Sequence, residues 1–109
     1  MLPGATEQDI QKGILDYLLL RKYVAFKHNS TQFGVRDGKN FAFSNSKKGV
    51  ADIIACSPKG TFVAIEVKKP GGRATPEQLE FLEKVRSAGG IGILAFSLED
   101  VMGKVGESS

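Results

Sequence analysis

Two apolar segments joined by a tight turn constrain the fold of this chain most strongly. "VADIIACS" at 50–57 and "TFVAIEVKK" at 61–69 both have the length and composition of strands, so an antiparallel hairpin is expected. If its turn centres on Lys59, Asp52 lies directly opposite Glu66. Opposed side chains of an antiparallel pair share one face of the sheet, with Cβ atoms about 5 Å apart. The hairpin therefore predicts two adjacent carboxylates.

Lys68 is expected on the same face, because it lies two positions beyond Glu66. Two opposed carboxylates repel each other, and a divalent cation between them would remove the repulsion. A few hard oxygen ligands suit Mg²⁺ or Mn²⁺ better than zinc, and a nearby ammonium can stabilise a phosphate or orient water. A structural alternative is a Glu66–Lys68 ion pair at a strand end, with Asp52 bonded to loop amides. Asp52 at the matching register favours the functional interpretation.

The segments before this hairpin predict a helix and further strands. Thr6 is a good N-cap with Asp9 three positions later, and an apolar stripe follows at helical spacing. The stripe consists of Ile10, Ile14, Leu15, Tyr17 and Leu18. A strand is expected at 23–29. Between them and the main hairpin, Asp37-Gly38 favours a second hairpin or an ordered loop at 31–44.

The segments after the hairpin predict a second helix and a last strand. Thr75 is placed to cap this helix, with Pro76 at its first position and Gln78 at its third. Its expected buried stripe is Leu79, Leu82 and Val85, with Phe81 beside them. Gly89-Gly90 ends the helix, "IGILAF" at 91–96 is a strand, and Ser97 opens a short helical turn.

The order of these elements predicts an α/β fold: a small mixed β-sheet flanked by α-helices, in the order α-β-β-β-α-β. The 109 residues fit a single domain at 1–109, with a core at about 6–96 and a short helical turn and tail at 97–109. No apolar run is long enough to span a membrane, and no signal peptide is recognised at the N-terminus. A cytoplasmic protein without a membrane partner is expected.

Composition excludes some kinds of site. Cys56 is the only cysteine, so neither an intramolecular disulfide nor a thiolate zinc site can form, and Cys56 is expected in the core. His28, the only histidine, is interpreted as a strand residue without a chemical role. The formal net charge of +3 agrees with a polyanionic partner without requiring one.

An ordered set of motifs resembles a known family. "GVAD" at 49–52, "EVK" at 66–68, Gln78 on the next helix and Glu7 on the first helix resemble the VRR-NUC family of the PD-(D/E)XK nuclease superfamily. The resemblance covers about 6–96, in the stand-alone minimal form found in phages, and implies a restriction-endonuclease-like core. Ala51-Asp52 replaces the superfamily's proline-aspartate, which agrees with the looser Gly-x-x-Asp form of this family.

The resemblance implies a role for each of these residues. Asp52 and Glu66 would hold Mg²⁺ or Mn²⁺ together with the main-chain carbonyl of Val67. Lys68 would position or activate the attacking water. Two further side chains have structural alternatives. Glu7 would reach the metal directly or through water, although an acid in the first turn of a helix is favourable by itself. Gln78 would orient Lys68 or the water, although its position is also that of a capping box.

Basic residues flank the expected site. Lys47 and Lys48 precede the Gly49 loop, and Lys69 and Arg73 follow Lys68, so these four residues are the candidates for contacts with DNA phosphates. Arg36 and Lys39 are more simply interpreted as solvated loop residues.

The resemblance implies a metal-dependent DNA endonuclease whose products carry a 5′-phosphate and a 3′-hydroxyl. A homodimer that cuts branched DNA, such as a four-way junction, is the leading hypothesis, in the cytoplasm of a bacterial or phage-infected cell and without a small-molecule cofactor. One alternative is a monomeric nuclease, either non-specific or acting on flaps and ends. Another is a nucleic-acid-binding module without activity. Phe33, Phe41 and Phe43 would either close the core or cover a dimer interface.

Overall fold

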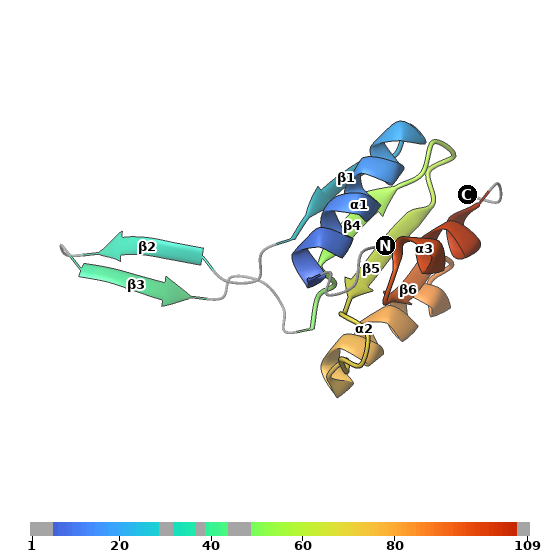
Figure 1. The fold of residues 1–109 in the computed structure, drawn as a ribbon. Helices are drawn as coiled ribbons and strands as arrows, with labels where there is room; N and C mark the ends of the chain where they lie inside the picture. The colour runs from blue at the N-terminus through green and yellow to red at the C-terminus, as the bar shows by residue number, and fades with distance from the viewer. Residues whose placement is uncertain (1–5, 29–31, 37–38, 44–48, 107–109) are drawn as a thin grey trace.

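The computed structural model of the protein describes residues 6–28, 32–36, 39–43 and 49–106. Three helices and six strands follow one another along these residues (Figure 1). They are α1 (Glu7–Leu20), β1 (Val24–Lys27), β2 (Gln32–Arg36), β3 (Lys39–Phe43), β4 (Ile53–Cys56), β5 (Phe62–Val67), α2 (Pro76–Ser87), β6 (Ile91–Ala95) and α3 (Leu98–Val105).

The main sheet has four strands in the order β1-β4-β5-β6. β1 and β5 each run antiparallel to β4, whereas β6 runs parallel to β5. The chain crosses from β5 to β6 through α2, since parallel neighbours need a crossover connection. This arrangement confirms the predicted mixed sheet flanked by helices.

β2 and β3 form a separate two-stranded antiparallel sheet. This confirms the second hairpin at the level of its strands, while its expected turn at 37–38 lies outside the described residues. The register pairs Gly34 with Phe41 and Phe33 with Ala42. Neither interpretation of Phe33, Phe41 and Phe43 is tested, because the side chains of this hairpin lie outside the description.

The register of β4 against β5 is the predicted one. Ile53 pairs with Ile65, and Ile54 pairs with Ala64. One step beyond the last pair, Asp52 lies opposite Glu66, as expected for a turn centred on Lys59. A slip of one residue would have placed the two acids on opposite faces of the sheet.

Helices cover the two faces of the sheet unequally. α1 and α3 pack on one face, where the larger core cluster includes Ile10, Ile14, Ile53, Ile65 and Val101. On the other face α2 packs against β5 and β6 and buries a smaller cluster. Both predicted capping boxes form, at Thr6 in α1 and at Thr75 in α2. The first stripe is confirmed for Ile10, Ile14 and Leu18, which are buried.

The predicted stripe of α2 is wrong at one position. Leu82 and Val85 are buried, but the Leu79 side chain is 47% exposed. The face that α2 turns to the sheet follows the spacing 78, 81, 82, 85, so the first position of the stripe belongs to Gln78. Leu79 lies about 100° further round the helix and faces solvent.

Part of the α2 face of the sheet remains uncovered. Val24 is 71% exposed, Phe26 54% and Phe62 45%, and Cys56 is also exposed. The prediction of a core position for Cys56 is therefore wrong. Its side chain lies in the row of Val24 and Phe62, at the end of β4 that α2 does not reach.

No helix within the described part of the chain combines the length and the apolar character needed to span a bilayer.

Candidate active site

The two predicted acids meet where β4 begins and β5 ends. Asp52 directly precedes β4, and its Oδ2 atom accepts a hydrogen bond of 2.9 Å from the main-chain N–H of Val67. This bond continues the pairing of the two strands through a side chain. It holds the Asp52 carboxylate beside Glu66, on the face of the sheet covered by α2.

Glu66 is almost completely buried, with 1% of its surface exposed. Its Oε2 atom accepts a hydrogen bond of 3.0 Å from Nε2 of Gln78 and lies 3.6 Å from Nζ of Lys68. Its Oε1 atom is buried and has no hydrogen-bond partner among the described residues. Such an orphaned carboxylate oxygen in a structured protein calls for a missing partner, such as a water or an ion.

The same burial changes the acidity of Glu66. Desolvation of the buried carboxylate raises the pKa of Glu66 to about 8, and the negative charge of the neighbouring Asp52 acts in the same direction by repulsion. The Lys68 ammonium opposes this rise but does not cancel it. Glu66 is therefore protonated at neutral pH unless a cation compensates its charge.

Gln78 has the capping role that the sequence offered, and its side chain also contacts the buried acid. Its Oε1 atom accepts a hydrogen bond of 2.8 Å from the N–H of Thr75, while Oγ1 of Thr75 accepts one of 3.2 Å from the N–H of Gln78. The remaining amide group donates to Glu66. The side chain thus closes the N-terminus of α2 and contacts the buried acid at once. Its predicted orientation of Lys68 or of water is not tested by these contacts.

Gly49 brings the loop before Asp52 close to α2. Its φ is +89°, and a Cβ atom at this position would lie 2.6 Å from the carbonyl oxygen of Glu77. Only glycine allows both this backbone conformation and this approach. The Gly-x-x-Asp motif therefore has a steric basis: it packs the loop against the first turn of the helix that carries Gln78.

The donor groups fit a hard divalent cation. Asp52 and the orphaned Oε1 of Glu66 supply two carboxylates, and the main chain of Val67 faces the side of β5 on which Asp52 lies, since its N–H bonds to that residue. A site with so few protein ligands leaves positions for water and phosphate, as Mg²⁺ and Mn²⁺ require. No trio of His, Cys, Asp or Glu side chains in the described part of the chain is grouped to hold a metal.

Glu7 is therefore not brought into a three-acid cluster with Asp52 and Glu66. It is the first residue of α1, on the face of the sheet opposite α2, and is partly exposed. A direct bond from Glu7 to the metal is not supported by this arrangement. Its contact through water remains a prediction.

His28 is a neighbour of the site that sequence reasoning missed. It directly follows β1, and its main-chain N–H donates a hydrogen bond of 2.7 Å to the carbonyl oxygen of Asp52. Its Nε2 atom is buried and finds no hydrogen-bond partner within the ranges that the structure describes. The register of β1 against β4 places His28 beside Asp52. This register could not be predicted from the sequence, because no tight turn joins the two strands.

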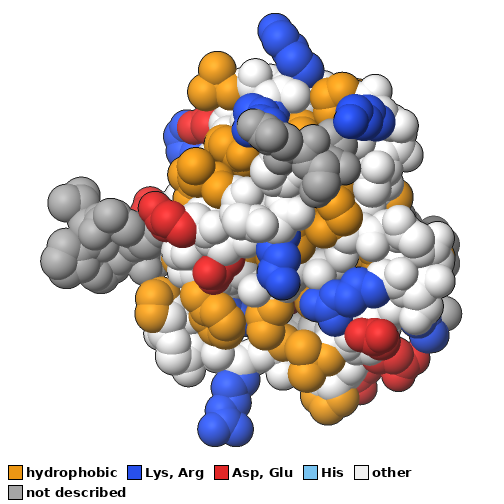
Figure 2. Space-filling view, turned by 90° about the vertical axis from the view of Figure 1, so that its right-hand side faces the viewer, with side chains coloured by type: hydrophobic (Ala, Val, Ile, Leu, Met, Phe, Trp, Pro, Cys, Tyr) orange, Lys and Arg blue, Asp and Glu red, His pale blue; other side chains and the backbone are white. Residues whose placement is uncertain are grey.

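The basic candidates are only partly described. Lys69 and Arg73 are exposed in the loop between Lys68 and α2, beside the acids. Lys47 and Lys48 lie outside the described residues. Figure 2 shows one face of the molecule, on which basic side chains are scattered among hydrophobic and uncharged ones and do not form one broad patch. Contacts with phosphates are therefore best sought in the loops that flank the acids.

Comparison with known proteins gives a consistent result. A model of the VRR-NUC domain family matches residues 8–96. One similar solved structure, described as a VRR_NUC domain, has a TM-score of 0.67 at 20% identity and covers 96% of this chain and 100% of its own. Another, described as a VRR_NUC domain protein, has a TM-score of 0.59 at 22% identity and covers 94% of this chain and 86% of its own. No curated protein matched the chain.

Proposed function

Because the chain belongs to the VRR-NUC domain family of nucleases, we propose that it is a metal-dependent DNA endonuclease that hydrolyses phosphodiester bonds. One observation carries this proposal. Asp52 and Glu66 lie side by side at the strand ends, and an ammonium lies 3.6 Å from Oε2 of the buried Glu66. The other oxygen of Glu66 has no partner in the described part of the chain. A purely structural acid would have its hydrogen bonds satisfied.

Asp52, Glu66 and the Val67 carbonyl would hold Mg²⁺ or Mn²⁺. When bound, the ion would supply Lewis-acid stabilisation of charge on the phosphate and would lower the pKa of a coordinated water. Glu66 would bind it as the carboxylate, without the proton that its raised pKa favours in the metal-free protein. No other cofactor is needed for hydrolysis.

The protein side chains orient the reacting groups. The Lys68 side chain is only 16% exposed, and its main-chain N–H donates to the carbonyl oxygen of Ala95 on β6. This anchored ammonium orients the attacking water or stabilises charge on a phosphate oxygen. Gln78 holds the Glu66 side chain in place through its 3.0 Å hydrogen bond to the same oxygen, Oε2.

The flanking basic residues bind the DNA backbone. Lys69 and Arg73 extend from the loop beside the acids, and Lys47 and Lys48 precede Gly49 in the sequence. Such contacts would position a phosphate at the acids but carry no base specificity.

The proposed substrate is branched DNA, with a four-way junction as the leading candidate. Cleavage of both strands at a junction needs two sites, and each chain has one pair of acids. A homodimer with two-fold symmetry would supply the second site. The alternatives are a monomeric nuclease acting non-specifically or on flaps, and an inactive nucleic-acid-binding module.

The test is cleavage of labelled duplex, flap, splayed-arm and four-way-junction DNA with Mg²⁺, Mn²⁺ or EDTA. Asp52→Asn keeps an acceptor for the Val67 N–H but removes a charge, so cleavage should fall about a hundredfold or more. Glu99→Gln, an exposed acid on α3, serves as the matched control. Full activity of Asp52→Asn would refute the site. Equal cutting of all substrates by a monomer favours the first alternative, and binding without cutting favours the second.

A further inference from the structure

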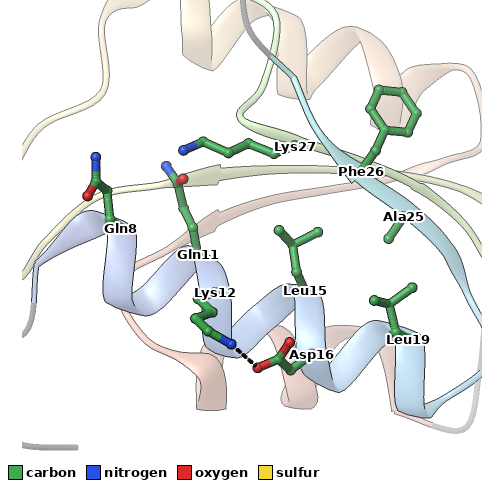
Figure 3. A pocket seen from close by; sticks show the side chains of 9 residues that line it. All are labelled: Gln8, Gln11, Lys12, Leu15, Asp16, Leu19, Ala25, Phe26 and Lys27. Carbon is green, nitrogen blue, oxygen red and sulfur yellow. Dashed lines mark hydrogen bonds and ion pairs between the residues drawn. The ribbon is translucent and has the colours of Figure 1, made fainter.

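A groove of about 320 Å³ lies between α1 and β1, on the edge of the sheet away from β6. In Figure 3 the side chains of Leu15 and Leu19 point from the helix toward the strand, while Phe26 points away from the helix. Leu19 and Phe26 are both 54% exposed. The groove therefore has an open apolar part formed by Leu15, Leu19 and Ala25. Its other lining includes the polar side chains of Gln8, Gln11, Lys12, Asp16 and Lys27.

The strand on this groove has an unpaired main-chain edge. Among the described strands, β1 pairs with β4 alone. The N–H of His28 points to β4, and antiparallel strands alternate the direction of these groups, so Val24 and Phe26 also point to β4. The N–H and C=O groups of Ala25 and Lys27 consequently point outward. Two residues are thus ready to pair with another strand.

The floor of the groove contains a polar atom that lacks a partner. Gln11 on α1 lines the groove and is only 7% exposed. Its Oε1 atom is buried and accepts no hydrogen bond from the described part of the chain. Buried amide oxygens are normally satisfied, so a hydrogen-bond donor is missing beside Gln11.

We propose that β1 of a second copy of this chain pairs antiparallel with β1 across a two-fold axis at Phe26. This inference rests on the homodimer of the proposed function and identifies its interface. In this register Ala25 of each copy exchanges both main-chain hydrogen bonds with Lys27 of the other. The sheets of the two copies become one continuous sheet.

The side chains are complementary in this register. Phe26 lies opposite Phe26 of the second copy, and such aromatic cross-strand pairs stabilise sheets. Lys27 lies opposite Ala25 and avoids Lys27 of the other copy. It instead approaches the end of the groove that contains Asp16, an acid now paired with Lys12 at 3.0 Å on the solvent side.

These features indicate a second copy in preference to an unrelated peptide. A two-fold partner must present the same surface, so each feature needs its complement on the same chain. The outward main-chain groups of Ala25 and Lys27 bond to the same groups of the second copy. Phe26 lies opposite Phe26 of that copy. The groove is also lined by charges of both signs, Lys27 and Asp16 among them. A register centred on Lys27 would oppose two ammonium groups and is disfavoured.

Disulfide trapping tests the register. In a Cys56→Ser background, Phe26→Cys places two thiols on a non-hydrogen-bonded pair with Cα atoms about 4.5 Å apart, within disulfide range. Val24→Cys is the matched control, because it is exposed on the same face of the same strand. Its symmetry mate lies four residues along the strand, about 13 Å away, too far to bridge. Mild oxidation should cross-link Phe26→Cys almost completely and leave Val24→Cys uncross-linked.

Light scattering measures the oligomeric state of the same protein. The wild type should have twice the mass of one chain, and Phe26→Glu should halve that mass with an unchanged circular dichroism spectrum. A monomeric wild type would overturn the proposal. A dimer that Phe26→Cys does not trap, or that both cysteines trap equally, would place the interface elsewhere, for example on the β2–β3 hairpin. None of these readouts measures cleavage, so an inactive enzyme and a wrong interface give different results.

Discussion

At the scale of single residues, the site depends on a glutamine with two tasks. Gln78 accepts the Thr75 N–H with one end of its amide and donates to Glu66 with the other. Sequence patterns treat capping and catalysis as competing explanations of such a residue. Here the two ends of one amide group bond to different partners, so the cap leaves the contact with Glu66 available for the proposed chemistry.

Two variants should separate these tasks. Gln78→Glu keeps an acceptor for the cap but replaces the donor to Glu66 with a second carboxylate, so cleavage should fall about tenfold or more. Thr75→Ala should lower the free energy of unfolding by about 1 kcal/mol and retain the donor. Urea denaturation and cleavage rates measure both. Parallel losses of stability and rate in the two variants would contradict the separation.

The raised pKa of Glu66 predicts a pH-dependent stability. The pKa is about 8 in the folded protein against 4.5 ordinarily, so between these values the folded state holds a proton that the unfolded chain has released. The metal-free protein should therefore lose stability as pH rises through this window, by up to about 1.4 kcal/mol per pH unit. Glu66→Gln should abolish this contribution, as measured by urea denaturation in EDTA from pH 5 to 9. An unchanged slope in Glu66→Gln would show that the carboxyl does not titrate in this range.

At the scale of elements, the loop at Gly49 and the first turn of α2 form one unit. Gly49→Ala should displace α2, because its Cβ would lie 2.6 Å from the Glu77 carbonyl oxygen. Gly60→Ala is the matched control, since Gly60 has a φ of +90° but open space around its Cβ position. Both variants incur the conformational cost of about 1–3 kcal/mol. Only Gly49→Ala should also lose cleavage, and equal cleavage by the two would contradict this packing.

Elements with strong local signals were predictable from the sequence. The turn around Lys59 fixed the register that opposes Asp52 and Glu66, and the two capping boxes fixed where α1 and α2 begin. Leu79 and Cys56 were misplaced, because their exposure depends on how far α2 extends over the sheet. His28 was missed for a related reason: the pairing of β1 with β4 is a long-range contact that no local turn specifies.

At the scale of the whole molecule, the formal net charge is only +3. We therefore expect DNA binding to depend on local clusters of basic residues. The Lys69→Ala, Arg73→Ala double variant should weaken DNA binding and lower the slope of log affinity against log salt by about one for each lost phosphate contact. Lys59 and Lys104 are exposed at the far end of the β4–β5 hairpin and on α3, so their double alanine variant is a charge-matched control. Fluorescence anisotropy at several salt concentrations measures both. Equal slopes for the two double variants would show that Lys69 and Arg73 do not contact DNA phosphates.

The two hydrogen bonds of the Gln78 side chain have a consequence for the activity of the proposed nuclease on warming. Helix termini open more readily than the core of a fold. Each opening of the first turn of α2 would release Glu66 from its amide partner while the sheet stays intact. Warming would then inactivate the proposed nuclease reversibly, at a temperature below that at which the whole molecule unfolds.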